Sequence, residues 1–262
     1  MDTCKVCGNE SKLLFKTLVL KKYTTSYYQC INCQFIQTES PHWLNEAYES
    51  AITSLDIGIM YRNMCIYPIL TSILRFFFNP KGKYVDYGGG YGILTRIMRD
   101  KGYDFYRYDT YCQNIFAKDF DKTNPESADQ YELLTAFEVF EHLENPSAEL
   151  EKMLKWSTNI FFSTELQQTK INSPDDWWYI IPETGQHIAF YTVKSLQLLG
   201  EKYGLNFYTN GVNLHMFTKL KISPLLFKLF AKYRIAKIID MIPSKNKSLL
   251  MTDFESLKQE KA

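Results

Sequence analysis

The sequence predicts an α/β fold in which a mainly parallel β-sheet carries helices on both of its faces. Strand-like and helix-like segments alternate over residues 83–218, and such alternation is typical of parallel sheets. The last two strand-like segments are joined through Gly211, which predicts an antiparallel hairpin at the end of the sheet. We expect strands at 84–87, 104–108, 131–137, 159–164, 205–210 and 212–218, and helices at 92–101, 111–118, 146–157 and 192–203.

A glycine-rich turn follows the first strand of this domain. Residues 84–87 are short and apolar, as in a buried strand, and residues 93–99 have the apolar spacing of a helix. Between them lie three glycines at a spacing of two: Gly88, Gly90 and Gly92. Such a turn lets backbone approach a ligand closely, and the N-terminus of the following helix favours a negative group. It is not the dinucleotide pattern G-x-G-x-x-G, because Ile93 stands where the last glycine would be.

The composition indicates a globular protein and disfavours several other classes. The chain has 262 residues, of which 45% are hydrophobic, so we expect either one large domain or a domain with a small additional module. A net charge of +1 argues against a general nucleic-acid binder, because such proteins usually carry a basic face. We find neither the roughly 18 consecutive apolar residues of a membrane span nor a signal peptide. A cytoplasmic protein with reduced thiols is therefore expected.

Four cysteines near the N-terminus form two C-x-x-C pairs: Cys4, Cys7, Cys30 and Cys33. Thiolates at this spacing can grip one metal ion from a tight turn, and two such turns complete a tetrahedral zinc site. The β-favouring stretches 13–20 and 23–29 lie between the pairs, so residues 1–40 are predicted to form a zinc-ribbon module. The alternative is disulfides or free thiols, of which a reducing compartment disfavours the first. Because the module has no dense basic patch, we interpret it as structural or as a substrate lid.

A helical connector precedes the α/β domain. Residues 41–82 are predicted to contain helices at 43–51 and 59–78, with Pro68 as a kink or a start. One interpretation is that these helices only cover the edge of the sheet. The other is that polar and aromatic side chains of this segment, including Arg62, line the cofactor or acceptor pocket.

A C-terminal helical extension is predicted over residues 219–262. Its segment 224–239 is basic and amphipathic, which is typical of helices that contact a membrane surface or a partner. The commoner role of such a helix is to cover the sheet or to contact a second copy of the chain in a homodimer. Residues 244–262 are polar, and we expect them to fray.

Acidic residues follow successive strands of the predicted sheet. Asp109 comes after the second strand, where a carboxylate can accept hydrogen bonds from two ribose hydroxyls. Asp119 and Phe120 follow, and they could bond an adenine amino group and stack on its ring. Glu138 ends the strand at 131–137. Because ligands of such sheets bind at the carboxyl ends of the strands, these residues together predict a cofactor pocket.

Two motifs resemble those of the class I S-adenosylmethionine-dependent methyltransferases. Asp86 opens an Asp-x-Gly-x-Gly-x-Gly pattern that resembles motif I, and residues 137–146 resemble the E-V-x-E-H-x-x-x-P segment of motif IV. With the cysteine pairs and the segment 185–187, the chain resembles the zinc-ribbon methyltransferases of sugar and surface-polysaccharide pathways over residues 4–218. The resemblance implies a seven-stranded Rossmann-like sheet, S-adenosylmethionine and structural Zn²⁺. It implies cofactor contacts from Asp86, Gly88, Gly90, Gly92 and Asp109, and more weakly from Asp119, Phe120 and Glu138.

A long aromatic insertion follows the fourth predicted strand of the domain. Residues 166–187 contain a pair of tryptophans, and loops of this length are usually functional. Paired tryptophans can form an apolar wall or stack on a sugar ring, although one of them is expected simply to pack the loop. We therefore take the following as acceptor-binding candidates: Arg62, Trp178, Tyr179 and Tyr191.

Methyl transfer from a sulfonium is an in-line displacement, and a neutral hydroxyl acceptor must also lose its proton. Histidine suits this task, and His187 at the end of the insertion is our first candidate for the base. His142, with Glu141 beside it, is the second. The alternative for each histidine is a structural hydrogen bond to backbone. An acceptor oxygen that is already anionic would need no base.

The sequence therefore predicts an enzyme that O-methylates a small sugar-nucleotide, phosphoryl or phosphoramidate precursor of a capsule or surface polysaccharide. The nearest alternative is a C-methyltransferase that acts on a nucleotide-linked keto-deoxysugar. An RNA methyltransferase with a zinc-ribbon binding module is a further alternative, which the near-neutral charge disfavours. A non-catalytic binding protein is disfavoured by the intact glycine and acidic residues. We expect a small-molecule acceptor, no nucleic-acid partner and no transmembrane segment.

Overall fold

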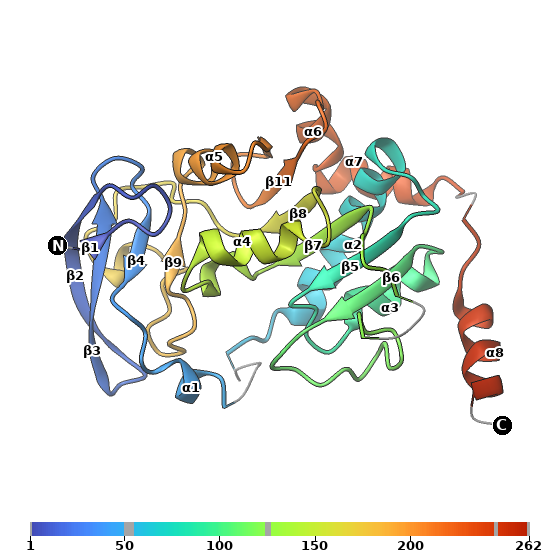
Figure 1. Cartoon of the computed structure of the whole chain (residues 1–262), viewed down its shortest axis with the longest axis horizontal. Coiled ribbons are helices and arrows are strands. Elements are labelled where there is room, and N and C mark those ends of the chain that lie inside the picture. The colour runs from blue at the N-terminus through green and yellow to red at the C-terminus, as the bar shows by residue number, and fades with distance from the viewer. Residues whose placement is uncertain (1, 50–54, 124–126, 244–245, 261–262) are drawn as a thin grey trace. The chain divides into compact units, whose positions relative to one another are not determined.

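The computed structural model describes residues 2–49, 55–123, 127–243 and 246–260 (Figure 1). The chain forms two compact units, residues 1–56 with 136–221 and residues 57–135 with 222–262. The ends of the helix predicted at 43–51 and of the tail predicted at 244–262 lie outside the described residues. In the described part of the chain, no helix combines the length and the apolar character that crossing a membrane would need.

The first unit contains a small antiparallel sheet near the N-terminus (Figure 1). Its strands, in spatial order, are β1 (Asp2–Thr3), β2 (Glu10–Val19), β3 (Tyr23–Cys30), β4 (Ile36–Thr38) and β9 (Ala189–Phe190). Strands β2 and β3 form the hairpin that the sequence predicts between the cysteine pairs. Strand β9 follows the insertion 166–187 and pairs with β4, so a segment distant in the sequence completes this sheet.

An apolar core packs against the small sheet and fixes the insertion. Tyr27 and Ile36 from the strands belong to one buried cluster with Trp43 and Trp177. The indole N–H of Trp43 also donates to the backbone oxygen of Gly185 at 2.9 Å. One of the paired tryptophans thus packs the insertion in place, as we expected for one of the two.

The larger sheet is mixed and has six strands within the described residues, one fewer than the resemblance implies. In spatial order they are β10 (Asn206–Thr209), β11 (Leu214–Thr218), β8 (Ile160–Ser163), β7 (Leu133–Phe137), β5 (Lys83–Tyr87) and β6 (Asp104–Tyr108). Strand β5 pairs in parallel with β6 and β7, whereas β11 pairs antiparallel with β10 and β8. The predicted α/β class and the closing hairpin are therefore confirmed.

Helices follow the strands at most of the predicted places. They are α1 (Leu44–Ala47), α2 (Ile59–Phe77), α3 (Ile93–Asp100), α4 (Pro146–Leu154), α5 (Val193–Lys202), α6 (Pro224–Phe230), α7 (Tyr233–Met241) and α8 (Leu250–Glu260), with 3₁₀ turns η1 (Phe140–His142) and η2 (Pro174–Asp176). At α4 the side chain of Asn145 accepts the N–H of Ala148 at 3.1 Å, and Pro146 takes the first helical position. Helix α2 runs through Pro68 rather than starting there.

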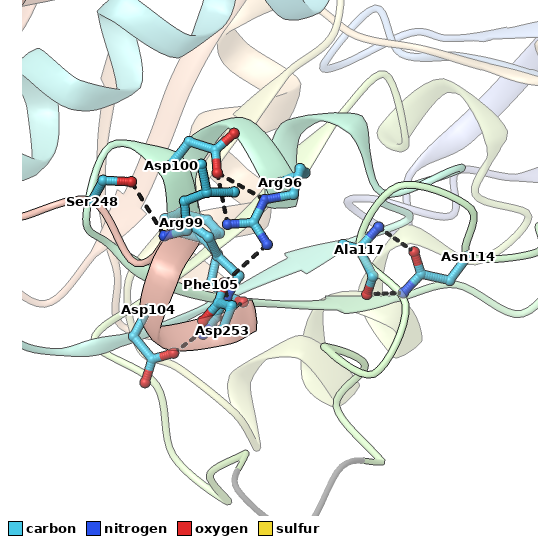
Figure 2. A network of polar contacts seen from close by, with 10 residues as sticks. Arg96, Arg99, Asp100, Asp104, Phe105, Asn114, Ala117, Ser248 and Asp253 are labelled. Carbon is cyan, nitrogen blue, oxygen red and sulfur yellow. Dashed lines mark hydrogen bonds and ion pairs between the residues drawn. The ribbon is translucent and has the colours of Figure 1, made fainter. Parts of the chain in front are cut away.

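The helix predicted at 111–118 is wrong, because the segment forms turns instead. Short polar side chains bond the backbone groups that a helix would use. Asp109 Oδ1 accepts the N–H groups of Tyr111 and Cys112 at 2.8 and 2.7 Å. Asn114 donates to the carbonyl of Ala117 at 2.6 Å and accepts its N–H at 3.0 Å (Figure 2). These bonds hold the segment as a loop.

The C-terminal extension differs from its prediction in two ways. The single helix expected at 224–239 is divided into α6 and α7, because the backbone is extended at Lys232. The fraying expected within 244–262 is wrong for α8, which is helical. Figure 2 shows the reason: Asp253 of α8 makes a two-point ion pair with Arg99 of α3, at 2.6 and 2.9 Å. This pair anchors a helix whose apolar side chains Leu250, Met251 and Phe254 are exposed and therefore contribute little to holding it in place.

Candidate functional site

The turn after β5 requires glycine for two separate reasons. Gly90 has a φ of +53°, a backbone conformation that L side chains rarely adopt, although an added Cβ there would meet open space. Gly92 has a φ of +84°, and an added Cβ would lie 2.5 Å from Asn114 Oδ1. The amide groups of Gly88 and Gly89 are already bonded to the carbonyl of Tyr108. These two amides are therefore turned toward the sheet, whereas Gly88 is exposed and Gly90 has open space beside its Cα, so that a ligand could approach the turn closely.

Asp86 lies beneath this turn rather than on its surface. Its side chain is buried, and Oδ1 accepts the hydroxyl of Thr135 on β7 at 2.6 Å. Burial, together with the charge of Asp109, raises the pKa of Asp86 from 3.8 to about 7. These contacts give Asp86 a role in shaping the turn, whereas its contact with the cofactor stays a prediction.

Asp109, at the end of β6, bonds the glycine turn at Gly90. Its Oδ2 accepts the N–H of Gly90 at 3.0 Å, and Oδ1 accepts the two amides of the following loop. A carboxylate has about four acceptor positions, so these three bonds leave room for a further donor such as a ribose hydroxyl. The structure thus places Asp109 against the glycine turn, where the sequence predicts it.

The two weaker candidates after Asp109 have different surroundings. Asp119 is exposed and has a φ of +74°. Phe120 is buried, and its ring centre lies 3.8 Å from the guanidinium carbon of Arg99. Their contacts with adenine stay predictions, and for Phe120 a cation–π contact already occupies part of the ring.

Sequence reasoning missed several residues that build this part of the site. Arg107 of β6 is buried and donates to the carbonyls of Gly90 and Cys112 and to Asp121. Two exposed aromatic side chains, Tyr111 and Phe116, lie on the loop that follows Asp109. The signal for the loop was present in the sequence, because Asp and Asn at its start favour turns over helix.

Glu138 follows β7 in a strained backbone conformation, with a φ of +53°. Its N–H donates to Ser163 Oγ at 2.9 Å, and the same hydroxyl donates to its Oε1 at 2.5 Å. Burial raises the pKa of Glu165, and the charge of Glu138 raises it further. A hydrogen bond from Asn213 acts in the opposite direction. The position of Glu138 at the end of β7 agrees with its prediction, and its contact with the cofactor stays a prediction.

Glu141, His142 and His187 lie together, with one ligand atom from each within 4.8 Å of the others. Glu141 is fully buried in η1. His142 Nδ1 lies 3.0 Å from the carbonyl oxygen of Gln186 and 3.0 Å from the Tyr48 hydroxyl. The two imidazole rings meet edge to face, with their centres 5.0 Å apart. The structure therefore brings the three predicted catalytic candidates into one cluster.

The predicted acceptor-binding residues fall into two groups. Tyr179 and Tyr191 are buried, and burial together with the charge of Glu141 raises the pKa of both phenols well above 10.0. The hydroxyl of Tyr191 donates to the carbonyl of Phe140 at 2.9 Å, so this residue supports η1. Trp178 is 71% exposed, and Arg62 is exposed near the start of α2. Of these four side chains, only Trp178 and Arg62 expose surface to a ligand, and their role in acceptor binding stays a prediction.

The four predicted zinc ligands also lie together. Cys4 Sγ is 3.6 Å from Cys33 Sγ, and Cys7 Sγ is 3.5 Å from the sulfurs of Cys30 and Cys33. These separations are too long for disulfides, which need about 2.05 Å. They approach the roughly 3.8 Å between sulfurs of a tetrahedral site with Zn–S bonds of about 2.3 Å. The four side chains are close enough to share one metal ion.

A cavity of about 760 Å³ lies elsewhere, at the amino ends of β5 and β6. Lys83, Asp104 and Asp253 of α8 are among its lining residues. Ligands of open α/β sheets bind at the carboxyl ends of the strands, so we do not assign the cofactor to this cavity.

Comparison with known proteins gives a family. Residues 61–210 match a family model described as a methyltransferase domain. A solved structure of magnesium protoporphyrin IX methyltransferase from Synechocystis PCC 6803 with bound SAH is 10% identical, covering 68% of this chain and 96% of that chain (TM-score 0.44). The plantazolicin methyltransferase BpumL with SAH is 15% identical, covering 68% and 93% (TM-score 0.45). No curated protein matches the chain.

Proposed function

We propose an acceptor and a chemistry from one premise: this chain belongs to the methyltransferase-domain family and is an S-adenosylmethionine-dependent methyltransferase. We propose that it methylates an oxygen atom of a small sugar-nucleotide, phosphoryl or phosphoramidate precursor of a surface polysaccharide. The observation that carries this proposal is the cluster of Glu141, His142 and His187, which gathers proton-accepting groups in the unit that holds the aromatic insertion.

The glycine turn is our proposed binding site for the cofactor. Gly90 has open space beside its Cα, and Asp109 accepts the Gly90 N–H while keeping acceptor capacity for ribose hydroxyls. S-adenosylmethionine supplies an activated methyl group when bound. The protein's part is to place the acceptor oxygen opposite the departing sulfur, because in-line geometry supplies much of the rate.

A neutral hydroxyl must lose its proton as it attacks the methyl carbon. The new C–O bond then forms while the C–S bond breaks, and the electron pair of that bond stays on sulfur. Among the side chains of the cluster, His187 is our first candidate for the group that accepts the proton, and His142 is the second. Each imidazole is already oriented by a bond to a backbone oxygen, which is how a catalytic base is held in position.

The cysteine cluster supports a structural zinc ion in the N-terminal module. Its sulfur separations suit a tetrahedral site with four cysteine ligands. Thiolates are the form that binds metal. We propose that zinc stabilises residues 1–40, because a module of this size has little core of its own.

The direct test is transfer of an isotopically labelled methyl group from S-adenosylmethionine to a panel of nucleotide-linked sugars, phosphorylated sugars and RNA. We expect product from at least one sugar or phosphorylated compound, with the label on oxygen, and none from RNA. Label on carbon, with deuterium exchange into the acceptor, would favour the keto-deoxysugar alternative because carbon attack requires an enolate. Transfer to RNA alone would contradict the proposal.

A further inference from the structure

The cluster of Glu141, His142 and His187 has the donor set of a metal site. It offers one carboxylate and two imidazoles, with one ligand atom of each within 4.8 Å of the others. These residues come from two separate segments, η1 and the end of the insertion, so their approach is made by the fold and not by local sequence. Nothing in the family match assigns a metal to them.

The hydrogen bonds of both histidines select the tautomer that binds metal. His142 Nδ1 lies 3.0 Å from the carbonyl oxygen of Gln186, and His187 Nδ1 lies 2.8 Å from that of Tyr179. A carbonyl oxygen can only accept, so these contacts favour a proton on each Nδ1, with the Tyr48 hydroxyl as a second neighbour of His142 Nδ1 at 3.0 Å, and leave Nε2 as the deprotonated nitrogen. Metal-ligating histidines characteristically donate their other N–H to a carbonyl or carboxylate in this way.

The charge of the cluster also favours a cation. Glu141 is fully buried and interacts electrostatically with the buried phenols of Tyr179 and Tyr191. A buried carboxylate lies in a region of low polarity, where the opposite charge of a divalent cation would stabilise its ionised form. Carboxylate oxygen and imidazole nitrogen are both common ligands of such cations.

We propose that Glu141, His142 and His187 bind a divalent first-row cation, and that an oxygen of the acceptor completes its coordination. Imidazole with carboxylate suits Zn²⁺, Mn²⁺ and related ions, and three protein ligands leave positions open for a substrate. Ligand atoms of one such ion stand about 3.4 Å apart at bonds of about 2.1 Å. Binding is therefore expected to draw the three side chains slightly inward.

This inference rests on the proposed function and changes one step of it: the bound cation, in place of His187 as a base, promotes loss of the acceptor proton. A cation-bound hydroxyl loses its proton to solvent more readily, because the cation stabilises the resulting anion. The bound oxygen then attacks the methyl carbon as described above, and His187 acts as a ligand in place of a base. The acceptor class is narrowed to compounds that present a hydroxyl or phosphoryl oxygen to a metal.

The test uses Mn²⁺ with the zinc-loaded full-length chain, followed by electron paramagnetic resonance of the free ion. We expect the wild type to bind one Mn²⁺ per chain at this site. Glu141→Gln and His187→Gln should each weaken that binding by about tenfold or more. His42→Gln is the matched control, because His42 is an exposed histidine outside the cluster, and it should bind Mn²⁺ like the wild type. Equal Mn²⁺ affinity in the wild type and both cluster variants would overturn the site.

A second measurement needs no variant and so does not depend on variant folding. In the wild type, bound Mn²⁺ should broaden the imidazole NMR signals of His142 and His187 at substoichiometric metal. Unchanged signals for both residues would overturn the inference. Calorimetry with S-adenosylhomocysteine on the same samples separates the two proposals. If the chain binds the nucleoside but no Mn²⁺, only the inferred metal site is contradicted. If it binds Mn²⁺ but no nucleoside, the proposed function is contradicted.

Discussion

At the scale of single residues, Asp86 shows how the glycine turn is supported from below. Its carboxyl group is buried, accepts the Thr135 hydroxyl and has a pKa raised to about 7, mainly by burial. Between about pH 4 and pH 7 the folded chain keeps a proton that the unfolded chain has released. Asp86 therefore contributes most to the free energy of unfolding at acid pH, and this contribution is lost as the pH rises through about 7.

We therefore predict that Asp86→Asn removes part of the pH dependence of stability. The asparagine carbonyl can still accept the Thr135 hydroxyl, but it has no proton to lose. Relative to the wild type, the variant's free energy of unfolding should rise by on the order of 2–3 kcal/mol between pH 5 and pH 8. Urea unfolding of both proteins at the two pH values measures this. A difference that does not change with pH would show that Asp86 is ionised throughout.

Comparing Asp86→Asn with the wild type also cancels the contribution that a second titrating group, His215, makes to the pH dependence of stability. Burial lowers the pKa of His215 to about 4, and a hydrogen bond to the Thr164 carbonyl opposes this shift. Its contribution has the opposite sign, since the stability it supports is lost as the pH falls from about 6.5 toward 4. Because both proteins contain His215, only the Asp86 contribution remains in the difference.

Residue types at strand ends could be predicted, whereas their side-chain partners could not. Asp109 and Glu138 were placed correctly because parallel strands bring their carboxyl ends to one edge, and that rule depends on order along the chain. The contact of Phe120 with Arg99 depends on how α3 meets the loop after β6, and the sequence pattern carries no sign of it. The cluster of His142 with His187 likewise needs a fold that joins separate segments.

At the scale of secondary-structure elements, α8 depends on ion pairs with α3. Asp253 is buried and bonds Arg99 at two points, while Arg96 lies 2.9 Å from the same carboxylate (Figure 2). Arg99 also pairs with Asp104 at 2.6 Å, so the guanidinium joins two elements to the end of the chain. Buried charges in such a network are costly to leave without their partner.

Asp253→Asn should accordingly destabilise the protein by about 3 kcal/mol, because it leaves a buried guanidinium with less compensation. The matched control is Asp100→Asn, which removes the exposed partner of Arg96 and should cost less than about 1 kcal/mol. Thermal or urea unfolding of the two variants measures the difference. Equal stability of both variants would mean that α8 contributes little to the fold.

Two of the wrong element predictions have a common physical origin. The segment 111–118 has helical apolar spacing, but Asp109 and Asn114 bond its backbone and hold it as a loop. The tail was expected to fray because it is polar, yet Asp253 ties it to α3. In both cases a few specific polar bonds outweigh the pattern of apolar residues, and patterns do not report such bonds.

At the scale of the whole molecule, the chain order of the modules differs from their grouping in space. The small sheet takes its last strand, β9, from residues that follow the insertion, and the C-terminal helices belong with residues 57–135. The domain boundaries after residues 40, 82 and 218 therefore stay predictions. Fold class was predictable because strand and helix alternate in sequence, whereas this exchange of segments depends on long-range pairing.

The central claim is that an S-adenosyl nucleoside binds where the turn after β5 meets Asp109. The most direct test is calorimetric titration of S-adenosylhomocysteine into the wild type, Asp109→Ala and the exposed control Asp100→Ala, with zinc content measured in each. We predict one nucleoside per wild-type chain, at least about tenfold weaker binding in Asp109→Ala through loss of charged hydrogen bonds, and unchanged affinity in the control. No binding by the wild type, or equal affinity in all three, would contradict the account.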